Sequence, residues 1–246
     1  MSYGVFSSYY DLFTQNVDYK AYADRIDGII KSLGLKQGSL VDLGCGTASL
    51  DVELCKLGYD ITAIDLSCDM LTAAAQKVYS QNLNIRLVNQ DMTSFALPFK
   101  AEAFISTLDG LNHLDGIESV KKVFAGVKKY LKPKGVFIFD MNTEYKHRYV
   151  LADNSFIFDS DEAYLGWQNE YHPEDSSVDI TLDFFLPDED GYQRITEEFT
   201  ERAYPVDTVL SALKECGLKA VAMYDGTDDK EPSDTTQRIL FVARHI

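Results

Sequence analysis

The chain has 246 residues, 46% of them hydrophobic, so it can bury a large core, and its formal net charge is −16. Because affinity for a phosphate backbone comes mainly from clustered lysine and arginine, this acidic balance makes nucleic acid a poor candidate partner. The sequence shows neither a basic N-terminal region followed by an apolar run nor an apolar segment long enough to cross a bilayer, so we expect a cytoplasmic protein without a membrane partner.

The first predicted helix covers residues 18–33, and a strand over 39–43 follows it. The apolar side chains of the helix recur at helical spacing, which is typical of a helix packed on a core. They are Tyr22, Ile26, Ile29, Ile30 and Leu33. The strand runs into VDLGCGTASL, at positions 41–50.

Two glycines in this run predict a nucleotide-type cofactor site. A strand that ends at Gly44 and Gly46 and opens into a helix lets the backbone approach a ligand, to which the helix presents unpaired N–H groups. The dinucleotide fingerprint G-x-G-x-x-G has a similar setting, but its third glycine is replaced here by Ser49. Asp42 would repel a pyrophosphate and attract a cationic amino-acid group. The residues therefore favour a cofactor that is cationic at this end.

Acids also follow the next two predicted strands. Asp65 ends the second strand, where a carboxylate can accept both ribose hydroxyls, and Ser67 is placed to cap the following helix. The third strand leads into Asp91 and Met92. Asp65 is common to nucleotide-binding proteins, so alone it supports the site more than the identity of the ligand.

The remaining elements continue the alternation of strand and helix that predicts a doubly wound, mostly parallel sheet. Helices are expected over 117–131, before Pro133 and Gly135, and over 206–216, before Gly217. The seven expected strands lie near 39–43, 61–65, 84–88, 103–107, 135–140, 218–224 and 238–244.

Residues 155–204 lose the helical period and alternate as strands do, with turn signals at 172–176 and 187–191. We therefore divide the chain into a cofactor-binding domain, 1–142 and 205–246, and an inserted antiparallel β subdomain, 143–204. Placed after the fifth strand, the insertion would lie over the carboxyl edge of the sheet as a lid or substrate wall. A sheet that is only decorative, or that forms a dimer, is the alternative.

The cysteines show no C-x-x-C spacing, so we expect buried reduced thiols and neither a structural zinc nor another metal. They are Cys45, Cys55, Cys68 and Cys216.

The run D-L-G-C-G-T, together with acids at three successive strand ends, resembles the class I S-adenosylmethionine-dependent methyltransferases. Residues 104–114, FISTLDGLNHL, are most similar to bacterial small-molecule N-methyltransferases of the amino-sugar and glycine or sarcosine type. One departure is Ala48, where the fullest motif has glycine. The resemblance implies S-adenosyl-L-methionine as cofactor and a seven-stranded Rossmann-like sheet whose last two strands form a hairpin.

The resemblance also implies site residues. His113 would be the catalytic base, because a free histidine titrates near neutrality. Tyr10, also expected in the catalytic site, would hydrogen-bond the cofactor or the substrate through its phenol. A histidine that only caps its loop, and a tyrosine that only packs, are the structural alternatives. Asn112 belongs to the same loop and is a candidate for orienting substrate or cofactor. The residues expected to bind the cofactor are Tyr10, Tyr19, Asp42, Gly44, Cys45, Gly46, Asp65, Leu66, Asp91, Met92, Leu108 and Asp109.

The implied reaction is methyl transfer to a nitrogen or oxygen of a small molecule by in-line displacement. The acceptor class includes cationic and amine-bearing molecules, and the protein is expected to be a monomer or a homodimer. Two alternatives stay open: a non-catalytic protein that binds S-adenosylmethionine, and an NAD(P)-dependent oxidoreductase. Against the second, no Tyr-x-x-x-Lys pair follows the fourth or fifth predicted strand.

Overall fold

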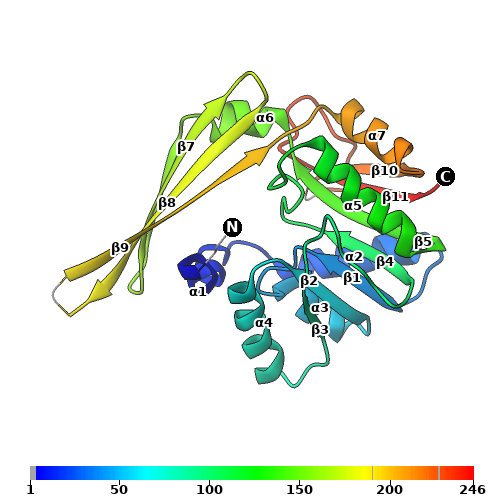
Figure 1. The fold of residues 1–246 in the computed structure, drawn as a ribbon, viewed down its shortest axis with the longest axis horizontal. Coiled ribbons are helices and arrows are strands. Elements are labelled where there is room, and N and C mark those ends of the chain that lie inside the picture. The colour runs from blue at the N-terminus through cyan, green and yellow to red at the C-terminus, as the bar shows by residue number, and fades with distance from the viewer. Residues whose placement is uncertain (1–3, 190, 227) are drawn as a thin grey trace.

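The computed structural model describes residues 4–189, 191–226 and 228–246. It contains a seven-stranded sheet in the order β10-β11-β5-β4-β1-β2-β3 and a separate four-stranded sheet, β6-β7-β8-β9 (Figure 1). The strands of the large sheet are β1 (Ser39–Leu43), β2 (Asp60–Asp65), β3 (Arg86–Asn89), β4 (Ala101–Ser106), β5 (Leu131–Asn142), β10 (Leu218–Asp225) and β11 (Arg238–His245).

The direction of the strands confirms the predicted doubly wound fold. Strands β1 to β5 pair in parallel, whereas β11 is antiparallel to both of its neighbours, β5 and β10. The final two strands therefore form the expected hairpin. Strand β5 begins four residues earlier than predicted, because Leu131 pairs with Ala101 through a register shift that accommodates Pro133.

Helices cover both faces of the large sheet. Helices α5 and α7 share one apolar core with β1, β4 and β5, and α2, α3 and α4 share the core on the other face. Ser67 caps α4 as predicted, since its side chain accepts a hydrogen bond from the Met70 N–H. The helices are α1 (Gly4–Phe13), α2 (Tyr19–Ser32), α3 (Ser49–Lys56), α4 (Cys68–Ser80), α5 (Ile117–Tyr130) and α7 (Val206–Glu215).

The inserted segment forms an antiparallel meander. It opens with a short helix, α6 (Glu144–Lys146), and a π-helical turn, η1 (His147–Leu151). The strands are β6 (Ser155–Asp159), β7 (Tyr164–His172), β8 (Ser177–Asp188) and β9 (Gly191–Arg202). The alternating residues Val178, Ile180, Leu182 and Phe184 bury one face of β8, as the period of two predicts.

Helix α1 was not predicted as a helix. It lies between α4 and the inserted sheet (Figure 1). The ring of Phe13 packs against the ring of Phe184, with 5.8 Å between the ring centroids. The segment that carries Tyr10 is thus held in place by the insertion.

The expectation of four buried thiols is wrong. Cys68 is exposed, and the other three cysteines are half-buried. The prediction located the cysteines on core-facing elements but did not resolve which face of an element each one occupies.

Within the three described ranges, none of the helices combines the length and the apolar character that a membrane span requires.

Candidate functional site

Two adjoining cavities lie at the carboxyl ends of the parallel strands. The larger has a volume of about 640 Å³, and the smaller about 50 Å³. Tyr10, Gly44, Gly46 and Leu108 line both, so α1, the glycine loop and the loop after β4 meet between them. This is the edge at which ligands bind in open α/β sheets.

The glycine loop needs its glycines for steric reasons. Gly44 has φ +81°, and a Cβ added there would lie 2.8 Å from Cε of Met92. Gly46 has φ +54°. Ala48 also adopts the left-handed conformation, at φ +59°, which explains why the fullest form of the motif has glycine at this position.

Asp65 ties this loop to the end of β2. Its two carboxylate oxygens accept hydrogen bonds from the backbone N–H groups of Gly46 and Ser67, each at 2.8 Å. A carboxylate offers about four acceptor positions, so Asp65, which lines the larger cavity, can also accept a hydrogen bond from a ligand. Burial raises the pKa of Asp65, while the backbone donors oppose that shift.

The smaller cavity collects seven of the residues predicted to bind the cofactor. They are Tyr10, Tyr19, Asp42, Gly44, Cys45, Gly46 and Leu108. Burial raises the pKa of the Tyr10 phenol far above its usual range, so the hydroxyl stays neutral and can donate a hydrogen bond. The Tyr19 hydroxyl donates to Oγ1 of Thr14 at 3.2 Å.

Residues at the ends of β2 and β3 and in the loop after β4 line the larger cavity. Asp65, Leu66, Asp91, Met92 and His113 line it. Oδ1 of Asp91 accepts hydrogen bonds from the Thr93 N–H and hydroxyl, at 2.7 and 2.8 Å, which fixes this carboxylate beside the cavity.

The loop after β4 is strained. Leu108 and Asp109 have φ values of +55° and +60°, a conformation that residues with a side chain rarely adopt. The buried carboxylate of Asp140, on β5, accepts hydrogen bonds from both backbone N–H groups at 2.8 Å. Asp140 therefore stabilises the loop that separates the two cavities.

Arg238 joins Asp109, in this loop, to Asp140 on β5. Its guanidinium lies 3.0 Å from Oδ1 of Asp109 and 3.2 Å from Oδ1 of Asp140. Burial alone would raise the pKa of Asp109, but the charge of Arg238 holds it well below its usual range. The Asp109 carboxylate, predicted to bind the cofactor, is thus engaged in an ion pair beside the cavity.

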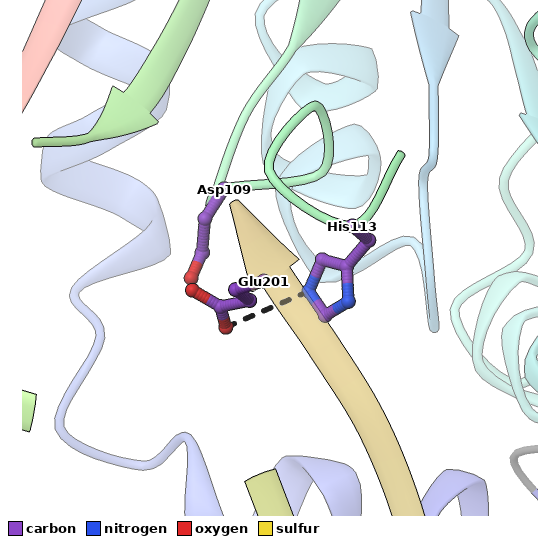
Figure 2. Close-up of side chains that lie close together, drawn as sticks. All are labelled: Asp109, His113 and Glu201. Carbon is purple, nitrogen blue, oxygen red and sulfur yellow. Dashed lines mark ion pairs between the residues drawn. The ribbon is translucent and has the colours of Figure 1, made fainter. Parts of the chain in front are cut away.

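His113 lies opposite a buried carboxylate from the insertion. Its Nε2 is 3.8 Å from Oε1 of Glu201, near the end of β9 (Figure 2). The other oxygen of Glu201 accepts a hydrogen bond from Asn142 at 2.9 Å and lies 3.6 Å from Nε2 of His147. His113 is 25% exposed at its side chain, whereas Glu201 is 5% exposed. The insertion thus supplies an acid directly behind the predicted base.

Asp109, His113 and Glu201 are all residues of metal-ligating type, with ligand atoms within 4.8 Å of one another. The 3.8 Å between the His113 nitrogen and the Glu201 oxygen exceeds the roughly 3.3 Å that separates neighbouring ligands of a tetrahedral zinc. Arg238 and Asn142 already engage both oxygens of Asp109. The Asp109 carboxylate is therefore already engaged within the protein.

Asn112 is structural rather than ligand-facing. It is fully buried, and its side chain donates to the backbone carbonyls of Asn142 and Arg202 and accepts from the Asn142 N–H. It connects the loop after β4 to β5 and β9.

Four residues of this region were not predicted as site residues from the sequence: Asp51, Asp140, Glu201 and Arg238. The only available signal was for Asp140, which lies in the strand-end run FDMNT. The others lie inside a helix or on strands far along the chain, where no local pattern distinguishes them.

Comparison with known proteins gives a consistent result. A family model described as a methyltransferase domain matches residues 40–135. A putative methyltransferase of Bacillus subtilis, YqeM, is 31% identical and aligns over 99% of this chain and 97% of its own length. A dTDP-3-amino-3,4,6-trideoxy-alpha-D-glucopyranose N,N-dimethyltransferase of Streptomyces venezuelae is 30% identical over 52% of this chain and 54% of its own.

Solved structures agree. The structure of an S-adenosylmethionine-dependent methyltransferase from Clostridium acetobutylicum is 34% identical and superimposes with a TM-score of 0.88 over 96% of each chain. DesVI of Streptomyces venezuelae has a TM-score of 0.80 over 97% of this chain and 98% of its own. At 21% identity, the second match shows a common fold.

Proposed function

The chain belongs to the S-adenosylmethionine-dependent methyltransferases, and on that premise we propose that it methylates the nitrogen of a small amine-bearing molecule by in-line displacement. The observation that carries this proposal is the buried Glu201 carboxylate behind His113, at the wall of the large cavity.

The residues of the two cavities fit the cofactor. None of the described residues donates a hydrogen bond to the buried Oδ1 of Asp42, and a cationic amino group would satisfy such an oxygen. The free acceptor positions of Asp65 suit ribose hydroxyls, and Asp91 and Met92 would frame the adenine. When bound, S-adenosylmethionine supplies a methyl group already activated on a sulfonium. The protein then has to orient the acceptor and exclude water, which is worth roughly 7 to 11 kcal/mol.

His113 has the position of a general base. It lines the large cavity and can take the proton that the acceptor nitrogen loses on methylation. Oε1 of Glu201 lies 3.8 Å from Nε2 of His113, on the side of the ring that the insertion covers. The neutral phenol of Tyr10, which lines both cavities, is available to donate a hydrogen bond to the acceptor or the cofactor.

Charge favours an amine over a hydroxyl as acceptor. Three carboxylates, Asp65, Asp91 and Asp115, line the large cavity together with a single Lys122. Such a lining attracts cations. The relative from Streptomyces venezuelae is named for dimethylation of an amino sugar, which supports the same acceptor class.

We propose that residues 143–204 form the substrate wall of a domain built from 1–142 and 205–246. Two contacts support the role of the insertion as a wall of the site. Glu201 of the insertion lies beside His113, and Phe184 of the insertion packs against Phe13 of α1, the helix that carries Tyr10.

An acceptor screen tests the function. Purified protein is incubated with S-adenosylmethionine and matched pairs such as glucosamine with glucose and ethanolamine with ethylene glycol, and released S-adenosylhomocysteine is measured. We expect release with at least one amine and none with its hydroxyl counterpart. Release that depends only on a hydroxyl would transfer the proposal to oxygen methylation.

His113→Ala is expected to lower kcat by about 10²–10⁴-fold, the usual contribution of a general base. The Kd for S-adenosylhomocysteine, measured by calorimetry, should change by less than about threefold. That is well below the tenfold change in Kd that about 1.4 kcal/mol of binding free energy would produce. His172→Ala, in a half-buried histidine of β7, is the matched control and should leave both values unchanged. Equal loss of turnover and cofactor affinity would mean that His113 only supports its loop.

A further inference from the structure

Two carboxyl groups are buried together behind the glycine loop. Asp42 is the penultimate residue of β1 and is 3% exposed, and Asp51 lies in the first turn of α3 and is 0% exposed. Oδ1 of Asp42 and both oxygens of Asp51 receive no hydrogen bond from a donor on another described residue. The groups instead interact with each other.

Such a pair cannot carry two full charges at low cost. Like charges in contact, away from water, force one group to retain a proton. Burial raises the pKa of Asp51 to about 7, and burial together with the neighbouring Asp51 raises that of Asp42 well above its usual range.

The surrounding charges reinforce this effect. Asp65 on β2 and Asp140 on β5 add negative charge, while burial and the neighbouring acids raise the pKa of the Cys45 thiol, which stays neutral. Lys77 on α4 is the cation that acts on Asp51, and the phenols of Tyr10 and Tyr19 lie across the smaller cavity. The site therefore has excess acid and needs a cation.

Asp42 lines the smaller cavity, where the cofactor's amino-acid end would bind, whereas Asp51 lies behind it. We propose that Asp42 and Asp51 share one proton in the free protein and release it to solvent when the cofactor's ammonium group pairs with Asp42. Asp51 is then a positioning residue that couples cofactor affinity to pH. In this step one carboxyl O–H bond breaks, and the ammonium compensates the second negative charge. The proposal rests on the cofactor assignment and is independent of the acceptor.

Calorimetry with S-adenosylhomocysteine tests the proposal without turnover, because this ligand keeps the ammonium group. Titrations at pH 6.5 in two buffers with different ionisation heats give the number of protons released on binding. The ligand's own amino group can also exchange a proton on binding, so the measured quantity is the difference between wild type and Asp51→Asn. We expect the wild type to release about 0.5–1 proton more than the variant. As the pH rises from 6 to 7, the Kd of the wild type for S-adenosylhomocysteine should also fall more steeply than that of Asp51→Asn, approaching tenfold per pH unit.

Asp27→Asn is the matched control. Asp27 is also a buried acid, but Tyr59, Gln37 and Lys31 already contact its carboxylate, so its substitution should not alter the proton count. Equal proton release from the wild type and Asp51→Asn would overturn the proposal. Failure of the wild type to bind the ligand would instead contradict the cofactor assignment.

Infrared difference spectroscopy keeps the test valid if Asp51→Asn does not fold. A protonated carboxyl absorbs separately from a carboxylate, so the wild type should lose one protonated-carboxyl band when S-adenosylhomocysteine binds. An unchanged band would also overturn the proposal.

Discussion

Asp140→Ala is expected to lower the free energy of unfolding by about 3–5 kcal/mol and to abolish tight cofactor binding. The substitution removes the acceptor of the Leu108 and Asp109 N–H groups and of the Tyr22 hydroxyl, and it removes a partner of Arg238. Buried donors without acceptors and an uncompensated buried cation are costly. The strained Leu108–Asp109 loop would then relax and change the wall common to both cavities.

Urea unfolding and calorimetry with S-adenosylhomocysteine measure the two effects. Asp24→Ala is the control, because Asp24 forms an exposed ion pair with Lys20, a type of contact worth about 0–1 kcal/mol. A loss below about 1 kcal/mol for Asp140→Ala, with unchanged ligand affinity, would show that the loop keeps its shape without this carboxylate.

Asp51→Asn is expected to make the protein without cofactor more stable at pH 8, by up to about 4 kcal/mol. The pKa of Asp51 is about 7 in the folded protein, above the usual value of 3.8. The unfolded chain therefore releases this proton first. The corresponding stability is complete below about pH 4 and is lost progressively as the pH rises to about 7. An amide at this position avoids that loss and can donate a hydrogen bond to Asp42.

The measurement is urea unfolding of both proteins at half-unit steps from pH 4.5 to 8. The difference in unfolding free energy should grow with pH and level off above about pH 7. Asp24→Asn, an exposed substitution, should show a constant small difference. A difference between wild type and Asp51→Asn that does not vary with pH would mean that Asp51 is not protonated in the folded protein.

Much of the fold was accessible from local patterns. The apolar runs of the parallel strands, the glycines after β1 and the Ser67 cap are signals that depend on residues close together in the chain. The period of two in β8 likewise revealed the inserted sheet. Since the carboxyl ends of parallel strands share one edge, the residues that end them could be assigned to one site.

Other features depended on contacts that a local pattern cannot show. Asp109 and Arg238 are 129 residues apart, and their ion pair joins the loop after β4 to β11. Helix α1 and the exposed Cys68 were missed because the packing partner or the helix face decides them.

By itself the sequence determined the sheet, the cofactor class and the residues that follow each parallel strand, because backbone geometry and side-chain periodicity act over a few residues. Only the tertiary structure placed Glu201 behind His113 and Asp51 beside Asp42, and it alone made Asp140 the support of the strained loop. Burial and charge between distant residues set these three relationships, since electrostatic energies depend on distance in space and on exclusion of water.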